Sequence, residues 1–294
     1  MEGHGSAPAS AERVELSPGS RQYTVLGRAV ACRGYRVDLD RARRRLELPT
    51  GAVSLVFGFG DSLRLTDAAD TGGATSVMKS LVSGVRTTAR IAEHRGRVGG
   101  VEVSFTPMTA QALFGVPMDE IAQSVLDPVD LLGPAAARIG EQLAECVSWP
   151  QRFALVDRLL AGRLAREDRS CPEVAWAWRQ LRADASAPVG PVLAETGWSR
   201  RRMERRFREY IGVAPKAVSQ IARLHRALRL LDTPMPLARI AVQAGYHDQA
   251  HLDRAFKAMT ARTPSQLRTE RALDPSAARP DRLADHVTSV VLST

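Results

Sequence analysis

Arginine is concentrated in one short stretch of the chain, WSRRRMERRFRE at residues 198–209. A guanidinium group presents five donors in a planar fork, which matches phosphate oxygens and the edge of a guanine base. Lysine is used only three times, as Lys79, Lys216 and Lys257. The stretch indicates a phosphate-bearing partner, although a biased genomic base composition produces the same preference for arginine.

A second stretch, GYHDQAHLDRAF at residues 245–256, repeats the framework of the first. Each copy has a glycine, then an aromatic residue, then Ser or Asp, then an apolar residue four positions before a Phe, and a proline eight positions after that Phe. Gly197 and Gly245 are 48 residues apart, whereas Phe207 and Phe256 are 49 apart. The second copy therefore has one extra residue in its turn.

Each copy predicts a helix-turn-helix unit. The glycine supplies the left-handed conformation that ends the first helix, and Ser199 or Asp248 caps the amides of the second helix. A long helix over residues 215–232 would join the units, which suits contacts one turn of DNA apart, ~34 Å. The apolar pairs that would anchor the second helices at i,i+4 spacing are Met203 with Phe207 and Leu252 with Phe256.

The positive charge lies where the repeat lies. The whole chain has a formal net charge of +9. Residues 191–275 alone hold fourteen arginines and two lysines against eight acidic residues, a balance of +8. A solvated basic face on an ordinary helical bundle would explain the charge but not the repeat, so the coincidence favours a nucleic-acid-binding surface.

Residues 188–270 resemble the tandem helix-turn-helix domain of the AraC/XylS family of bacterial transcription regulators. The second copy, AGYHDQAHLDRAFKAMTARTPSQLR, is similar to the family signature almost throughout. Ala261 stands where the family usually has glycine, so that helix end is expected to be tighter or differently capped. The resemblance implies recognition helices in successive major grooves of double-stranded DNA, with base-facing side chains at Arg201, Glu204, Arg205, Gln249, His251 and Arg254. It implies contacts with phosphates, which position without specifying sequence, from Arg200, Arg202, Arg206 and Lys257.

Three polar residues of these helices keep open roles. Glu204 can accept a hydrogen bond from cytosine N4 or pair with Arg200 or Arg208 on the same helix. His251 can contact a base edge or only a phosphate. Asp248 is expected to cap the helix rather than to contact DNA.

Residues 21–107 predict a β-rich domain. Short runs rich in Val, Phe and Tyr, among them QYTVLG, YRVDL and AVSLVFGFG, are separated by Gly, Asp and Thr. This spacing predicts a small barrel or a sandwich, and the segment VEVSFTPMTAQALFGVPMDEI resembles the N-terminal halves of some AraC/XylS regulators, including cupin-like barrels. A barrel of this size can hold one small molecule. The aromatic residues that would line such a site, or else pack in the core, are Tyr35, Phe57, Phe59 and Phe105.

Helical periodicity begins after Pro107. Ile139, Leu143 and Val147 recur at four-residue steps, and similar stripes follow to residue 184. These faces pack within the chain, form a dimer interface, or do both. The expected fold class is α+β: a β-rich domain that is cupin-like or a small barrel, then helices, then an all-α domain with two helix-turn-helix units. The expected boundaries are 1–20 for a disordered tail, 21–107 for the β-rich sensing domain, 108–184 for a helical sensing or dimerisation part, 185–272 for the DNA-binding domain and 273–294 for a C-terminal tail.

The composition argues against catalysis, cofactors and metals. His94 is the only histidine between residues 5 and 224, so neither a multi-histidine metal centre nor a nucleophile with a histidine base is expected. The three cysteines are far apart and form no CxxC motif. The first residues show no signal peptide and no run is apolar enough for a membrane span, so a cytoplasmic protein is expected.

These observations predict a transcription regulator that binds double-stranded DNA and responds to a small-molecule effector through its N-terminal domain. In the alternative, the N-terminal domain is only a dimerisation or protein-interaction module. RNA polymerase is a further expected partner if the protein is an activator, and a homodimer is an expected assembly. An enzyme with an appended helical domain is the third hypothesis, and steep salt dependence of DNA binding would count against it.

Overall fold

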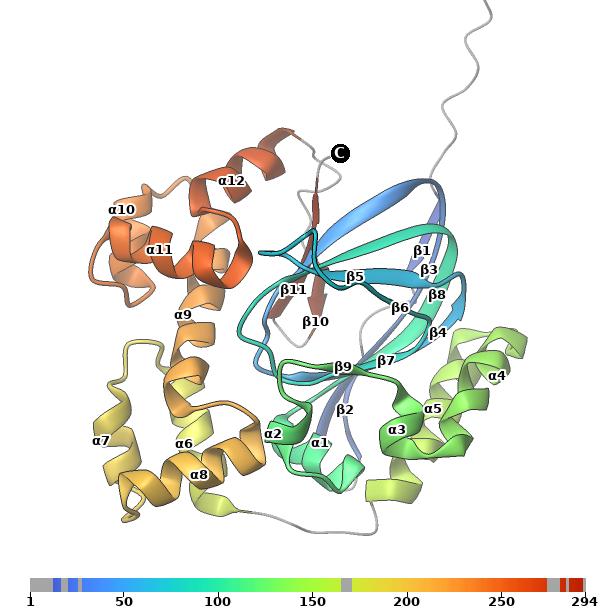
Figure 1. Cartoon of the computed structure of the whole chain (residues 1–294), viewed down its shortest axis with the longest axis horizontal. Helices are drawn as coiled ribbons and strands as arrows, with labels where there is room; N and C mark the ends of the chain where they lie inside the picture. Colours follow the sequence, from blue (N-terminus) through green and yellow to red (C-terminus); the bar gives the residue numbers. More distant parts are fainter. Residues whose placement is uncertain are drawn as a thin grey trace, which may run out of the picture.

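The computed structural model describes residues 13–16, 21–25, 28–164, 171–273, 281–283 and 286–292. Within these ranges the chain forms a curved antiparallel sheet with attached helices, followed by an all-α domain (Figure 1). This order confirms the α+β fold class expected from the sequence. The segment expected to be a disordered tail, 1–20, lies outside the described residues except for Arg13–Leu16, which form strand β1.

Two long strands, β3 (Arg28–Glu47) and β8 (Arg90–Phe105), form the centre of the sheet. They pair antiparallel along most of their length, with a register shift between Leu39 and Arg43. The other strands in the described part of the chain are β1, β2 (Arg21–Val25), β4 (Val53–Gly60), β5 (Leu63–Asp67), β6 (Ser76–Met78), β7 (Leu81–Ser83), β9 (Val125–Leu126), β10 (Asp281–Leu283) and β11 (His286–Leu292).

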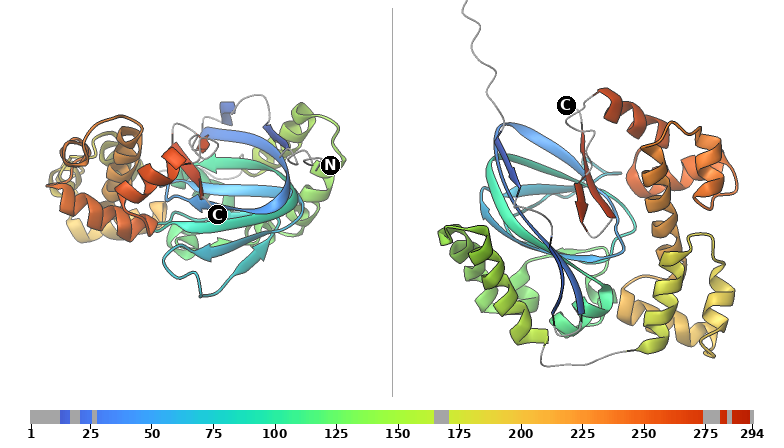
Figure 2. Two further views of the ribbon diagram at one scale, coloured as in Figure 1. Left: turned by 90° about the horizontal axis from the view of Figure 1, so that it is seen from above. Right: turned by 180° about the vertical axis from the view of Figure 1, so that it is seen from behind.

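The hydrogen-bonded order through the described strands is β10-β11-β3-β8-β4-β7-β9, and β1, β2, β5 and β6 pair off this path. The view from above shows that the sheet is strongly curved (Figure 2). At one point the curvature brings a helix against the backbone, because a Cβ on Gly34 of β3 would lie 2.2 Å from the ring of Trp149. A side chain at Gly34 would therefore push the helix that carries Trp149 off the sheet.

Short helices follow the sheet and pack against it. The stripe at Ile139 and Leu143, and the next one at Phe153 and Leu160, are buried in the main hydrophobic core, so these faces pack within the chain. Val147, which the sequence placed on the same stripe, is 88% exposed because the helix ends before it. The helices are α1 (Pro107–Phe114), α2 (Met118–Ile121), α3 (Pro128–Leu132), the 3-10 helix η1 (Pro134–Arg138), α4 (Ile139–Glu145) and α5 (Trp149–Leu164).

The all-α domain begins with α6, which packs against α7, α8 and α9. The sequence placed residues 172–184 with the helical sensing part instead, since their apolar stripe does not reveal which partner it meets. Val174, Trp178 and Leu181 of α6 are buried. The helices of this domain are α6 (Pro172–Ala183), α7 (Val189–Ala194), α8 (Arg200–Ile211), α9 (Pro215–Leu231), α10 (Leu237–Gln243), α11 (Gln249–Thr260) and α12 (Pro264–Leu273).

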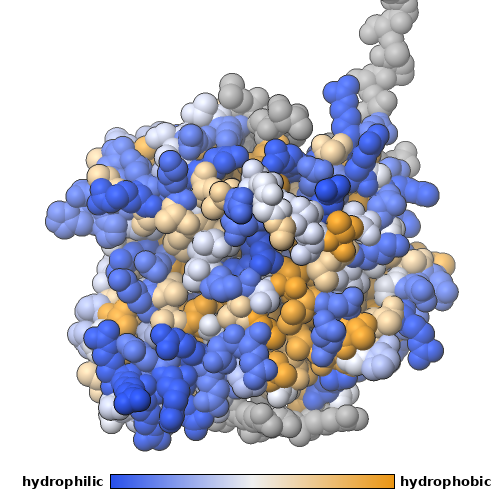
Figure 3. Space-filling view, in the orientation of Figure 1, coloured by the Kyte–Doolittle hydropathy of each residue, from blue (hydrophilic) through white to orange (hydrophobic). Residues whose placement is uncertain are grey.

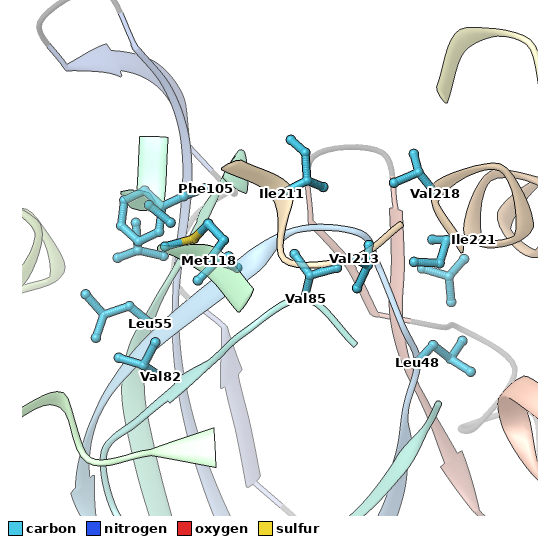
Figure 4. Packing of buried hydrophobic residues seen from close by; sticks show 14 of the residues in the cluster. Leu48, Leu55, Val82, Val85, Phe105, Met118, Ile211, Val213, Val218 and Ile221 are labelled. Atoms are coloured by element: carbon cyan, nitrogen blue, oxygen red, sulfur yellow. The ribbon is translucent and has the colours of Figure 1, made fainter. Parts of the chain in front are cut away.

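The two domains share an apolar interface. Val213 and Ile221 of the helical domain lie beside Leu48 and Val85, which lie between strands of the sheet domain (Figure 4). The His225 side chain on α9 is buried, and its Nε2 lies 2.8 Å from the carbonyl oxygen of Pro49. Backbone atoms also join the domains, because the amide of Ala89 donates to the carbonyl of Met259, at 2.7 Å.

The segment after the helical domain returns to the sheet. Strands β10 and β11 pair with each other, and Ser289–Leu292 of β11 pair antiparallel with Arg44–Glu47 of β3. From behind, this C-terminal hairpin lies between the sheet and the helical domain (Figure 2). The sequence had led us to expect only a tail over 273–294; residues 274–280, 284–285 and 293–294 of that range lie outside the described residues.

Candidate nucleic-acid interface

Each predicted helix-turn-helix turns at a glycine. Gly197 has φ of 72° and Gly245 has φ of 87°, both in the left-handed region that residues with a Cβ avoid. Gly197 follows α7, and Gly245 follows α10. The two turns therefore direct α8 and α11 away from the preceding helices with the same local backbone geometry.

The residues at the start of α8 and α11 satisfy amides of the first turn. Ser199 Oγ accepts a hydrogen bond from the amide of Arg202, at 3.3 Å. Asp248 Oδ1 accepts from the amide of His251, at 2.7 Å. That hydrogen bond, together with one from the His247 side chain, lowers the pKa of the Asp248 carboxyl. Both helices are thus capped at the residue type and position that the repeat specifies.

Each second helix is fixed to its domain by the same apolar pair. Met203 and Phe207 of α8 are fully buried, as are Leu252 and Phe256 of α11. Because these side chains occupy one face of each helix, the opposite face is turned to solvent. The orientation of the polar face is set by packing before any partner binds.

On α8 the exposed face carries a row of three arginines. Arg201, Arg205 and Arg208 are exposed, and their spacing of four and then three residues puts them on one stripe. None of the three forms an ion pair with a carboxylate among the described residues. Three guanidinium groups on one stripe with no internal counter-ion are available to an external anion.

The other charged residues of α8 are engaged within the helix or its turn. Glu204 pairs with Arg200 at 2.9 Å. Of the two roles that the sequence left open, a contact with cytosine or an ion pair on the same helix, the structure contains the ion pair. Arg206 pairs with Glu209 at 2.8 Å, and this interaction raises the pKa of Arg206.

Arg202 is positioned by an aromatic ring in the same unit. Its guanidinium lies 4.2 Å from the centre of the Trp198 ring, close enough for cation–π attraction. Arg202 is exposed as well, so stacking on the ring limits its side-chain conformers while leaving its donors accessible to solvent.

On α11 the exposed polar residues are fewer. Gln249, Arg254 and Lys257 are exposed and form no ion pair within the described part of the chain. His251 is half-buried, and its ring packs edge-on against Tyr246 with centroids 5.3 Å apart. His251 is therefore partly committed to holding the turn that precedes its helix.

The two exposed faces share a pair of cations at equivalent positions. The 49-residue offset of the repeat places Arg205 opposite Arg254 and Arg208 opposite Lys257. All four are exposed. Arg208 was not among the residues assigned to DNA from the sequence, although applying the same offset to Lys257 would have identified it.

Helix α9 separates the two units. It has 17 residues, so it is ~25 Å long at 1.5 Å per residue. Helix α8 lies near its beginning and α11 near its end (Figure 1). The hydrophilic residues over α7 and α8 gather in one area of the molecular surface (Figure 3). The two helices with exposed cations therefore lie near opposite ends of α9.

The sheet domain encloses a cavity of about 480 Å³. Tyr35, one of the four aromatic residues considered for a ligand site, lines it. Phe57, Phe59 and Phe105 do not; they are buried in the hydrophobic core, and the Phe59 ring also lies 5.3 Å from the Arg152 guanidinium. The sequence did not show whether these aromatic residues line a ligand site or pack in the core, because it does not reveal which face of the sheet borders a cavity.

Other candidate sites are few in the described part of the chain. No group of three or more His, Cys, Asp or Glu side chains there is arranged to hold a metal ion. Cys32, Cys146 and Cys171 form no disulfide within the described residues. Among the described helices, none combines the length and the apolar character that a membrane-spanning segment requires.

Two family models match parts of the chain. Residues 192–270 match a helix-turn-helix domain, and residues 26–127 match a domain described only as one of unknown function. The first match covers both capped units and the helix between them. The fold and the match together define the C-terminal part as a helix-turn-helix domain.

Curated relatives match part of the chain. MtrA, a transcriptional regulator of Neisseria gonorrhoeae, is 31% identical over 83 residues, which are 28% of each chain. The arabinose operon regulatory protein of Escherichia coli is 30% identical over 29% of this chain and 30% of its own. GlxA of Rhizobium meliloti is 37% identical over 48% of this chain and 46% of its own. The chain thus spans less than half the length of these relatives.

Solved structures also resemble the chain. The structure of ToxT from Vibrio cholerae aligns with 82% of this chain and 97% of its own, at 10% identity and a TM-score of 0.45. The DNA-binding domain of AdpA, solved in complex with target DNA, aligns with 35% of this chain and 94% of its own, at 30% identity and a TM-score of 0.31.

Proposed function

We propose that the protein is a sequence-specific transcription regulator that binds double-stranded DNA through α8 and α11. The proposal rests on two pairs of exposed cations without an ion pair among the described residues, Arg205 with Arg254 and Arg208 with Lys257. They lie at equivalent positions of α8 and α11, and both helices have the same type of turn, cap and buried apolar pair. Proteins that neutralise phosphates release counter-ions, so a repeated cationic face favours association with a duplex. The helix-turn-helix match over residues 192–270 and the similarity to named transcription regulators support the same function.

The contacts can be divided by geometry. Arg201, Arg205, Gln249 and Arg254 lie in the first two turns of their helices and are assigned to base edges, where Arg recognises guanine and Gln recognises adenine. Arg202, Arg208 and Lys257 are assigned to phosphates. Arg202 also stacks on Trp198 in the turn of the first unit.

Four residues given DNA roles by resemblance are assigned differently or more narrowly. Arg200 and Glu204 neutralise each other at the start of α8. Arg206 must leave Glu209 before it can contact a phosphate. His251 supports the turn beside Tyr246 and is assigned at most a phosphate contact.

The decisive experiment is selection of bound sequences from random duplexes by the full chain. A single enriched motif with two half-sites about one turn apart supports the proposal. The Arg205→Ala variant should lose preference in one half-site and Arg254→Ala in the other. Arg158→Ala on α5, which is exposed but outside the helical domain, is the matched control and should leave the motif unchanged. Enrichment of no motif would contradict the proposal.

We infer that the sheet domain senses a small-molecule effector, because it encloses a cavity and shares an apolar interface with the helical domain. The alternative, a module for dimerisation or protein contacts only, predicts no ligand-dependent change in melting temperature across a metabolite screen. We also propose that the protein forms a homodimer and acts in the cytoplasm. If it is an activator, it contacts RNA polymerase as well. Sedimentation analysis of the full chain tests the first of these.

A further inference from the structure

The cavity of the sheet domain has an apolar wall and a charged end. Its volume of about 480 Å³ lies within the range of small-molecule sites. The apolar side chains lining it come mainly from the central strands and the loops beside them: Val56, Leu63, Leu65, Leu81, Val98 and Val125. Such a wall accommodates the hydrocarbon part of a ligand and excludes water from its surroundings.

Arginines outnumber carboxylates at the charged end. Arg33 contacts Glu102 at 2.6 Å, and Arg45 lies 3.6 Å from Glu47. Arg86 also lines the cavity but forms no ion pair with any carboxylate among the described residues. With Arg43 and Arg90, five guanidinium groups line the cavity against two carboxylates of the strands, Glu47 and Glu102, which leaves an excess of positive charge next to an apolar wall.

The titration of nearby groups reflects this excess. Burial, and then the positive charge of Arg90, lower the pKa of Arg86 to about 10. Burial, and then the positive charges of Arg45 and Arg43, lower the pKa of His94 to about 4. His94 is thus neutral at pH 7. Burial also lowers the pKa of Arg45, so an added anion would stabilise its charged form, whereas burial of Arg33 is outweighed by the neighbouring Glu102, which raises the pKa of that guanidinium.

A third carboxylate reaches the cavity from the other end of the chain. Asp281, on β10, lines the cavity and forms an ion pair with Arg45. Its Oδ2 also lies 3.6 Å from Arg33 and accepts a hydrogen bond from Ser289 Oγ at 3.2 Å. Asp281 belongs to the C-terminal hairpin, which follows the helical domain in the chain and also contributes Thr288 and Val291 of β11 to the cavity lining.

The same hairpin is tied to the helical domain. Arg282, next to Asp281, pairs with Asp232 just after α9 at 3.1 Å. Asp232 also pairs with the buried Arg271 of α12, at 2.5 Å. A displacement of β10 would therefore change contacts at the end of α9, which is the connection to the second helix-turn-helix unit.

We propose that the cavity binds an organic anion with a carboxylate head and an apolar body, and that this head replaces Asp281 beside Arg33 and Arg45. Asp281 is an internal substitute for the ligand, and its departure loosens the C-terminal hairpin from β3 and from Asp232. The inference rests on the proposed function for its regulatory consequence, but binding and hairpin release are measured without DNA. A carboxylate is favoured because the resident group at this position is itself a carboxylate.

The first test uses octanoate as the probe and octanamide as the neutral control of the same shape. Isothermal titration of the full chain should show octanoate binding at least about tenfold more tightly than octanamide, since only the anion forms charge-assisted hydrogen bonds. The Arg86→Gln variant should weaken octanoate binding and leave octanamide unaffected. Equal binding of the two probes, or binding of neither, would overturn the proposal.

The second test examines the exchange with Asp281. The Asp281→Asn variant should bind octanoate about fivefold more tightly or better, because a competing carboxylate no longer occupies the arginines. Asp130→Asn, an exposed aspartate on α3, is the matched control and should bind like the wild type. An unchanged or weakened affinity in the Asp281→Asn variant would contradict the exchange.

The third test uses the wild-type chain, so it does not depend on how a variant folds. Octanoate should accelerate amide hydrogen exchange in residues 286–292 of the hairpin while slowing it in β4 and β8, which also line the cavity. Slower exchange in both would exclude release of the hairpin. DNA binding without octanoate is measured separately: failure there overturns the proposed function, whereas failure of the titrations overturns only the ligand assignment.

Discussion

Gly212 and Ala261 end α8 and α11 in the same left-handed conformation, with φ of 90° and 57°. They are equivalent positions of the repeat, 49 residues apart. Each donates its amide to the carbonyl four residues earlier, Arg208 and Lys257, at 2.7 and 2.8 Å. Only the second unit forms this helix end with a residue that has a Cβ. The sequence predicted a tighter or differently capped end at Ala261; the hydrogen bond is the same in both units, and the difference is the strained backbone conformation of Ala261.

Ala261→Gly should stabilise the protein. A left-handed conformation costs a residue with a Cβ roughly 1–2 kcal/mol, and the greater freedom of glycine in the unfolded chain offsets part of that gain. We expect the free energy of unfolding to rise by about 0.5–1 kcal/mol, measured by urea denaturation of the full chain. A destabilised variant would show that the methyl group of Ala261 makes compensating contacts.

The reciprocal change, Gly212→Ala, should lower the free energy of unfolding by more than the strain of a left-handed alanine alone would. A Cβ there would lie 2.8 Å from the carbonyl oxygen of Met118 in α2. The Cβ is fixed by the backbone of Gly212 and the oxygen belongs to the backbone of α2, so the contact cannot be relieved by rotating a side chain. We expect a loss of about 2 kcal/mol or more in the same denaturation experiment, and a weaker effect would mean that α2 and α8 separate readily.

Removing the Ser199 cap should weaken the first recognition helix. Ser199→Ala leaves the amide of Arg202 without its side-chain acceptor, which typically costs ~1 kcal/mol. The expected signature is faster hydrogen exchange at the first amides of α8 and reduced affinity for all DNA sequences alike. Ser199→Asp should restore the cap, and failure of that variant to do so would argue against this cause.

DNA binding should separate base contacts from phosphate contacts. Arg205→Ala should cost ~1–3 kcal/mol on the preferred sequence and relax the preference at one base position. Lys257→Ala should weaken binding to all sequences similarly and reduce the slope of log K against log salt by about 1. Fluorescence anisotropy over a salt series measures both, and identical behaviour of the two variants would contradict the assignment.

Stability should fall in mild acid because of His225. Burial, opposed by the contact with Pro49, lowers the pKa of this imidazole to about 4. A folded-state pKa below the unfolded value means that the unfolded chain binds the proton more tightly, so the stabilisation is present above pH ~6.5 and is lost progressively between pH ~6.5 and about 4. His94 shifts in the same direction. His225→Gln should flatten the decline measured by denaturation over this range, and an unaltered profile would assign the effect to His94 alone.

The sequence predicted the helical domain better than the cavity, for a physical reason. The glycines, caps and apolar pairs of the helix-turn-helix units act over a few neighbouring residues, so their spacing is enough to place Ser199 and Phe207. The cavity depends on contacts between distant segments, since Arg33, Arg86 and Asp281 come together only when the sheet closes on the C-terminal hairpin. No local pattern in the sequence near residues 281–292 predicts a hairpin whose second strand, β11, pairs with β3.

Even within the helical domain, side-chain pairing could not be decided from spacing. Glu204 can reach either Arg200 or Arg208 by its position on α8, and in the structure it pairs with Arg200. Likewise the stripe of α6 resembles those of α4 and α5, although its partners are α7, α8 and α9. Periodicity defines which face of a helix is apolar but not what covers that face.

The return of β11 to β3 makes the helical domain an insertion in the sheet domain rather than an appendage at its end. Both the incoming and the outgoing segment of the helical domain lead to the same sheet. A domain held at two points cannot swing freely as it could on a single linker; its movement is restricted to rotation about the line through those points. Mechanical pulling on residues 13 and 292 would therefore load the sheet first and leave the helical domain unstretched until β11 separates from β3.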